Sequence, residues 1–104
     1  MFPAYAAPVR SLSPDVVEYC KARGLFEHLM LALQLAESIF APVLRHEVEI
    51  ERDPETDEEA VVIVVAAALG VEEAVARKRE YTRQWVASIP LEVIGRIRLL
   101  LDID

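Results

Sequence analysis

The two histidines are the residues of this sequence with the widest range of possible chemistry. His28 directly follows Glu27, and His46 lies in a segment where apolar and polar residues alternate. Imidazoles beside a carboxylate can ligate zinc or transfer a proton. The sequence has no paired spacing such as His-x-x-x-His, so only the fold could bring the two rings together. One hypothesis is therefore a small ligand-binding or catalytic domain with a pocket between sheet and helices, lined by His28, His46, Tyr81 and Arg83.

Cys20 is the only cysteine of the chain. A thiol beside a histidine can act as a nucleophile, but the apolar neighbours Val16 and Val17 favour a small buried side chain instead. A single cysteine excludes an intrachain disulfide and a cysteine-based zinc cluster within one chain. With 3 glycines in all, the sequence cannot form a phosphate-binding glycine loop. We therefore expect no catalytic residue, no metal ligand and no cofactor, and favour a protein that is not an enzyme.

Two clusters of charge could bind a partner or could simply be solvated. The basic cluster of the 77–83 segment is preceded by acids at helical spacing, Glu73 before Arg77 and Glu80 before Arg83, which predicts surface ion pairs rather than a nucleic-acid site. The acidic cluster could bind a divalent cation or a basic protein, or could discourage edge-to-edge aggregation of a sheet, which is the favoured interpretation. The acidic cluster comprises Glu47, Glu49, Glu51, Glu55, Asp57, Glu58 and Glu59.

The residues must be positioned by a fold that centres on the apolar run 60–69. Five consecutive β-branched residues, 61–65, favour an extended backbone, and the run is too short to cross a bilayer. Segment 44–52 alternates, with Leu44, His46, Val48 and Ile50 predicted on one face, and a turn at 53–57 joins the two as a hairpin. Segment 96–103 is predicted as a third strand, with a helix as the alternative. The sheet is therefore predicted to have three strands, 44–52, 60–69 and 96–103.

Three helices are expected to cover one face of this sheet. The first follows Ser13-Pro14, an N-cap and a first-turn proline, and ends at Gly24, which can adopt a left-handed C-cap. The second runs from about 25 to 41 and ends before Pro42, and the third runs from about 71 to 88. The prediction is one α+β domain over residues 13–104, in the order ααββαβ, after an extended or disordered segment at 1–12.

Composition bears on association more than on chemistry. Of the 104 residues, 54% are hydrophobic, and the second helix is apolar nearly all round, so we expect a second copy or a protein partner to cover part of it. The candidate interface is Phe26, Met30, Leu31, Leu35 and Ile39. The net charge of −7 disfavours nucleic acid and anionic membranes as partners. The N-terminal residues lack the pattern of a signal peptide, which predicts a cytoplasmic protein.

The pattern resembles a group of small uncharacterised bacterial proteins of about this length. The resemblance covers a helical start like Tyr19 to Ala36, an acidic hairpin like Glu47 to Val65 and a Glu-Glu-Ala helix like Glu72 to Trp85. It implies no known activity and transfers no functional residue. The leading hypothesis is a non-enzymatic protein-interaction domain that acts as a homodimer or with a larger, basic partner, for example as an antitoxin-like neutraliser.

Overall fold

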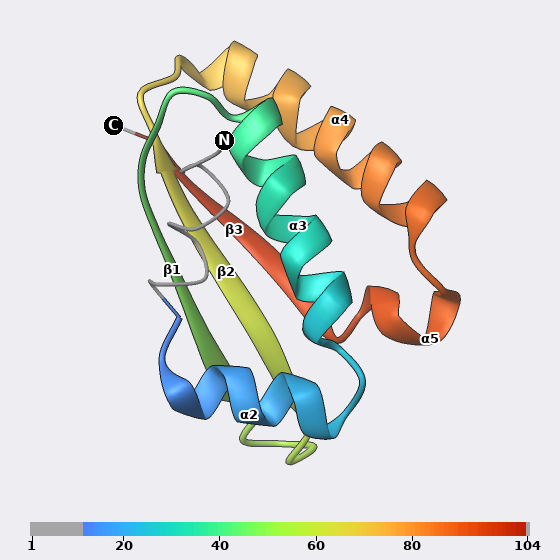
Figure 1. Ribbon diagram of the computed structural model, residues 1–104. Coiled ribbons are helices and arrows are strands. Elements are labelled where there is room, and N and C mark those ends of the chain that lie inside the picture. Colours follow the sequence, from blue (N-terminus) through green and yellow to red (C-terminus); the bar gives the residue numbers. More distant parts are fainter. Residues whose placement is uncertain (1–11, 104) are drawn as a thin grey trace, which may run out of the picture.

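The computed structural model describes residues 12–103 as helices packed on a small mixed sheet (Figure 1). The class is α+β, as predicted. The helices are α2 (Pro14–Ala22), α3 (Phe26–Ile39), α4 (Val71–Ser88) and α5 (Leu91–Ile94), and the strands are β1 (Val43–Arg52), β2 (Glu59–Ala67) and β3 (Ile97–Ile103). The extended segment expected at 1–12 lies outside the described residues except for Leu12, which is buried.

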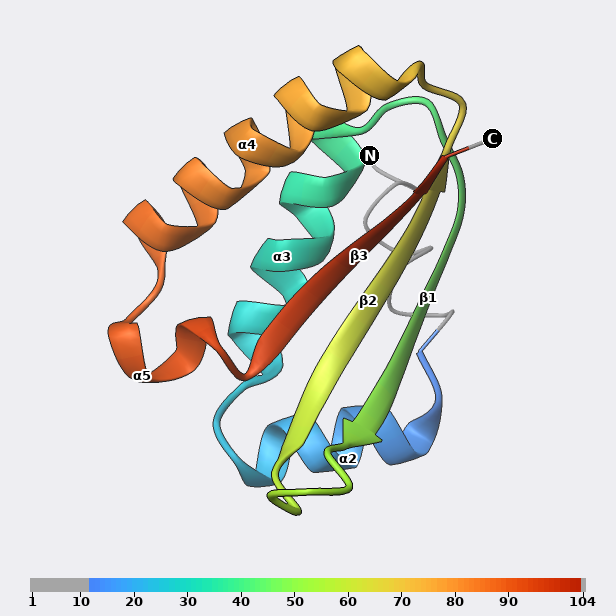
Figure 2. The ribbon, with the colours of Figure 1, turned by 180° about the vertical axis from the view of Figure 1, so that it is seen from behind.

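The sheet has the order β1-β2-β3, with β1 antiparallel and β3 parallel to the central strand. Helices α3 and α4 lie across one face, whereas the strands lie in front when the molecule is seen from behind (Figure 2). The parallel pair needs a crossover connection, which α4 and α5 supply. The predicted third strand is therefore a strand, and the predicted covering of one face by helices is confirmed.

The core lies between β2 and the helices. Alternate residues of β2, Val61, Ile63 and Val65, are almost fully buried and belong to one cluster with Leu29 and Phe40. Phe40 contacts Tyr81, whose ring stacks on that of Trp85 with centroids 6.3 Å apart. The aromatic side chains thus join α4 to the end of α3.

The first helix begins and ends as its sequence predicts. The Ser13 hydroxyl accepts a hydrogen bond from the Val16 backbone N–H at 3.3 Å, which is the expected N-cap. Gly24 has a φ of 69°, the left-handed conformation that a side chain disfavours. These local signals fix where α2 stops and α3 begins.

Three details differ from the prediction. Leu44 does not share the inner face with His46: a bulge between Val43 and Arg45 shifts the register, and Leu44 is exposed while Val43 packs on the core. The short helix α5 was not predicted, because four residues are too few to show helical periodicity. The strand bounds also move, to 43–52, 59–67 and 97–103.

Candidate functional site

The structure does not bring the two histidines together. His46, on β1, has its Nδ1 3.7 Å from Oε1 of Glu37 on α3. His28 is nine residues before Glu37 on the same helix, which corresponds to roughly 13 Å along the axis and half a turn around it. His28 therefore points away from the His46–Glu37 pair, and no shared pocket forms between the two rings.

The surroundings of His46 leave little room for a ligand. Its Nε2 is buried without a hydrogen-bond partner, beside a cavity of about 10 Å³ that Leu33, Ala36 and Val65 help to line. A cavity of this size holds about one water molecule. The site is consistent with a packed histidine and offers no space for a substrate.

Tyr81 and Arg83 also lie apart from this pair. Burial raises the pKa of the Tyr81 hydroxyl well above its ordinary value, and its ring belongs to the aromatic stack. Arg83 pairs with Glu80 on the exposed side of α4, and its hydrogen bond, followed by one from Gln84, lowers the pKa of the Glu80 carboxyl. The four residues of the pocket hypothesis thus occupy separate places in the fold.

Cys20 is fully buried and belongs to the core. Desolvation raises the pKa of its thiol, although nearby Arg23 acts in the opposite direction. Because the thiolate is the nucleophile, this environment is the reverse of the one that activates a cysteine. Across residues 12–103, no three histidine, cysteine, aspartate or glutamate side chains are grouped so that they could hold a metal ion.

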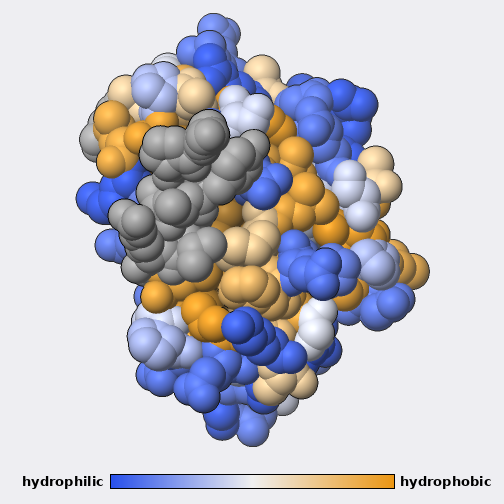
Figure 3. All heavy atoms as spheres, viewed as in Figure 1, coloured by the Kyte–Doolittle hydropathy of each residue, from blue (hydrophilic) through white to orange (hydrophobic). Residues whose placement is uncertain are grey.

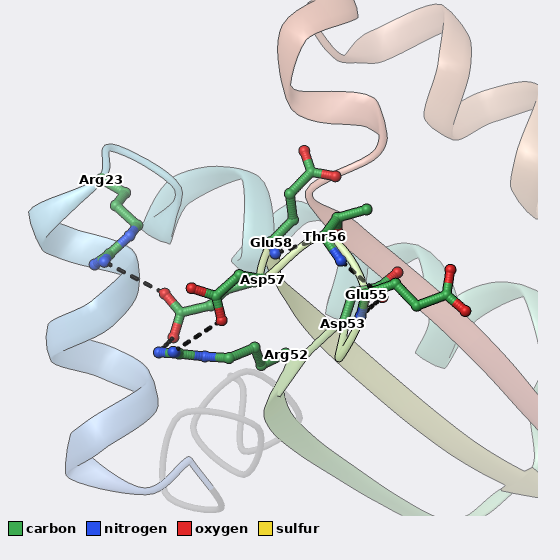
Figure 4. A network of polar contacts seen from close by, with 8 residues as sticks. Arg23, Arg52, Asp53, Glu55, Thr56, Asp57 and Glu58 are labelled. Atoms are coloured by element: carbon green, nitrogen blue, oxygen red, sulfur yellow. Dashed lines mark hydrogen bonds and ion pairs between the residues drawn. The ribbon is translucent and has the colours of Figure 1, made fainter.

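The acidic hairpin carries a polar network that attaches it to α2 (Figure 4). Arg52 donates to Asp57 and to Glu59, both at 3.1 Å, and Arg23, the C-cap residue of α2, lies 3.7 Å from the same Glu59. The hydrogen bond to Glu59 is also the main reason why the pKa of Arg52 is raised. At the tip, Asp53 accepts a hydrogen bond from the Glu55 backbone N–H at 2.8 Å. Part of the acidic cluster therefore forms the ion pairs and hydrogen bonds that stabilise the hairpin.

The basic residues of α4 form the pairs that their spacing predicts, and one of them also binds backbone. Arg77 donates to Glu73 at 2.8 Å, to the Ile39 carbonyl at 3.1 Å and to the Ala41 carbonyl at 2.6 Å. These carbonyls lie at the C-terminal end of α3, where the helix dipole favours a cation. Arg77 therefore fastens α4 to α3, which is a structural role.

The five residues of the predicted α3 interface are half-buried and pack against the core. Lys21 also places its ammonium group 5.1 Å from the centre of the Phe26 ring. Apolar side chains are still visible over α3 and between α3 and α4 (Figure 3). The interface at Phe26, Met30, Leu31, Leu35 and Ile39 stays a prediction, on a surface that is smaller than the sequence suggests.

Exposed apolar side chains gather around one groove where α4 meets β3. Val71 and Val75 of α4 are 68% and 47% exposed, and Leu100 of β3 is 54% exposed. An open groove of about 460 Å³ joins them; Leu101 and Ile103 complete its apolar side, and Lys78 and Arg79 of α4 line the rest. We call this groove and its strand the β3 edge site. Sequence analysis missed it because the helix-strand contact that forms the groove is tertiary.

A second hollow lies beside α5. It measures about 630 Å³ and is lined by charged groups of both signs, with Arg96 and Arg98 opposed by Glu58, Glu59 and Glu92. Mixed charges favour neither an anionic nor a cationic ligand. The β3 edge site is therefore the stronger candidate for binding.

No family model, no curated protein and no solved structure matches this chain. The resemblance to small bacterial proteins accordingly stays a prediction. Of the helices in the described part of the chain, none has both the length and the apolar character that crossing a membrane requires. Evidence on function comes from the geometry of the surface.

Proposed function

We propose that this chain is a non-enzymatic protein-interaction domain that acts as a homodimer. The observation that carries the proposal is the β3 edge site, where Val71, Val75 and Leu100 expose apolar surface around one groove. Burial of such a cluster of apolar side chains against a second surface is favourable, because it removes apolar area from water. The candidate reactive side chains, by contrast, lie apart from one another and have no pocket of substrate size.

The proposal is tested by the mass of the purified chain in solution. Sedimentation velocity from low to high micromolar concentration should show a species of twice 11.7 kDa. The apparent mass should rise with concentration and depend only weakly on salt, because burial of apolar surface is insensitive to screening. A single 11.7 kDa species over the whole range contradicts the proposal.

A larger basic partner is a second candidate, and the outward face of β1 favours it. Glu47, Glu49 and Glu51 alternate along this strand, in register with Val64, Val62 and Ala60 of β2. An exposed row of acids of this kind is complementary to a basic surface. Calorimetry with polylysine should show salt-dependent binding that the triple variant E47Q/E49Q/E51Q loses. Equal binding by both proteins would refute this second candidate.

A further inference from the structure

β3 differs from β1 in how its free edge is protected. β1 has the bulge near Val43 and alternating charges, and both features hinder the addition of another strand. In residues 12–103, β3 forms the opposite edge of the sheet, and it runs from Ile97 to Ile103 with no proline and with a regular register to β2. Its edge is therefore the one that is open to pairing.

The sequence of β3 is symmetric about its central residue. Around Leu100, the flanking residues are Leu99 and Leu101, then Arg98 and Asp102, then Ile97 and Ile103. When the strand is reversed about Leu100, each apolar residue falls opposite an apolar residue, and Arg98 falls opposite Asp102. We propose that a second copy of the chain pairs antiparallel with β3 about Leu100, which makes one continuous six-stranded sheet. The inference rests on the proposed function and specifies the surface through which the homodimer forms.

The backbone N–H and C=O groups of β3 point in the directions that this pairing needs. The Val61 N–H donates to the Arg96 carbonyl at 2.9 Å, so in the parallel ladder the even-numbered residues of β3 direct their backbone groups to β2. The N–H and C=O groups of Leu99 and Leu101 consequently face the free edge. In the proposed register, Leu99 is opposite the partner's Leu101, and the two form a hydrogen-bonded pair.

The charged residues then lie where side chains approach most closely. Arg98 is opposite the partner's Asp102 in a non-hydrogen-bonded pair, in which the Cα atoms are about 4.5 Å apart. Both side chains are on the outer face of the sheet and are exposed in the single chain, in which Asp102 also lies 4.0 Å from Arg45 of β1. The two-fold axis forms this pair twice. Charge complementarity therefore favours a second copy over an unrelated apolar partner.

The groove beside the strand adds apolar contact. Val71 and Val75 flank the edge on the helix side, next to Ile103. In the proposed register, Ile103 lies opposite the partner's Ile97, which brings apolar side chains from the second copy to the mouth of this groove. Pairing would therefore bury apolar surface that is exposed to solvent in the single chain.

A charge-reversal mixture tests the inference. In R98D, the new acid faces the partner's Asp102 twice, and in D102R two arginines oppose each other. Because like charges directly opposite are unfavourable, each variant alone should dimerise about tenfold or more weakly than the wild type. An equimolar mixture of R98D and D102R should recover the lost affinity, since the heterodimer contains two complementary pairs. Sedimentation velocity measures all three samples, and circular dichroism checks that each variant is folded.

E49K is the matched control, because Glu49 is an outward residue of β1 and is away from the β3 edge. It should dimerise as the wild type does. If the wild type dimerises and the mixture does not recover, or if E49K weakens dimerisation as much as R98D, pairing through β3 is wrong while the homodimer stands. If the wild type is monomeric throughout, both the inference and the proposed function are wrong.

Discussion

Two leucines on the two edge strands give a direct comparison of the edges. Leu100 of β3 and Leu44 of β1 are 54% and 55% exposed. Complete burial of an exposed leucine is worth about 1.5–3 kcal/mol, so covering the half of Leu100 that is exposed contributes about 1 kcal/mol per copy. A symmetric dimer counts this contribution twice. Leu100→Lys should therefore weaken dimerisation by about 2 kcal/mol, or about 30-fold, before any repulsion between the two ammonium groups.

The assay is the dimer dissociation constant from sedimentation equilibrium, measured for the wild type, Leu100→Lys and Leu44→Lys. Leu44→Lys should leave the constant unchanged, because β1 is the protected edge. Urea unfolding of the monomer should change by no more than about 0.5 kcal/mol for either variant, since both side chains are largely in water. Equal weakening by the two substitutions, or none by Leu100→Lys, would refute the assignment of the interface to β3.

Three other predictions concern the fold. Arg77→Met should lower the free energy of unfolding by about 1.5–3 kcal/mol, because the backbone carbonyls at the end of α3 lose a charged donor. The control variant Arg79→Met should change the free energy of unfolding little, and urea denaturation compares the two variants. Burial raises the pKa of Tyr81 above its ordinary value of 10.0, so the neutral hydroxyl contributes fully to stability below pH 10.0. Above that pH the free energy of unfolding should fall by up to about 1.4 kcal/mol per pH unit. Denaturation measured on both sides of pH 10.0 should show this fall, and Tyr81→Phe should reduce it. Cys20 should react with a thiol reagent only as fast as the protein opens, so its labelling rate should rise with urea; rapid labelling of the native protein would contradict its burial.

Local signals in the sequence predicted much of the fold. The β-branched run at 61–65 became β2, because stiff side chains suit a pleated strand, and Ser13 and Gly24 delimited the first helix. The bulge beside Leu44 was not predictable, because one extra residue in a strand leaves no mark on composition. It reversed the side to which Leu44 points, and with it the apolar face expected at the start of β1.

The candidate site was less predictable than the fold. The sequence shows that His28 and His46 exist, but about two and a half helical turns separate His28 from Glu37, the glutamate that His46 contacts, so the two point to opposite sides of α3. The apolar character of α3 suggested a large exposed interface, yet packing in the core buries one side of the helix and leaves the five residues of the predicted interface half-buried. The symmetry of β3 was present in the sequence, but only the topology identifies β3 as an edge strand.

Amide hydrogen exchange at the β3 edge tests the central claim most directly. The Leu99 and Leu101 N–H groups face the free edge, whereas the Leu100 N–H is directed at β2 and serves as an internal control. Exchange at Leu99 and Leu101 should slow as protein concentration rises through the dimerisation range, while exchange at Leu100 stays slow throughout. Equally fast exchange at Leu99 and Leu101 in samples that sedimentation shows to be dimeric would contradict pairing through this strand.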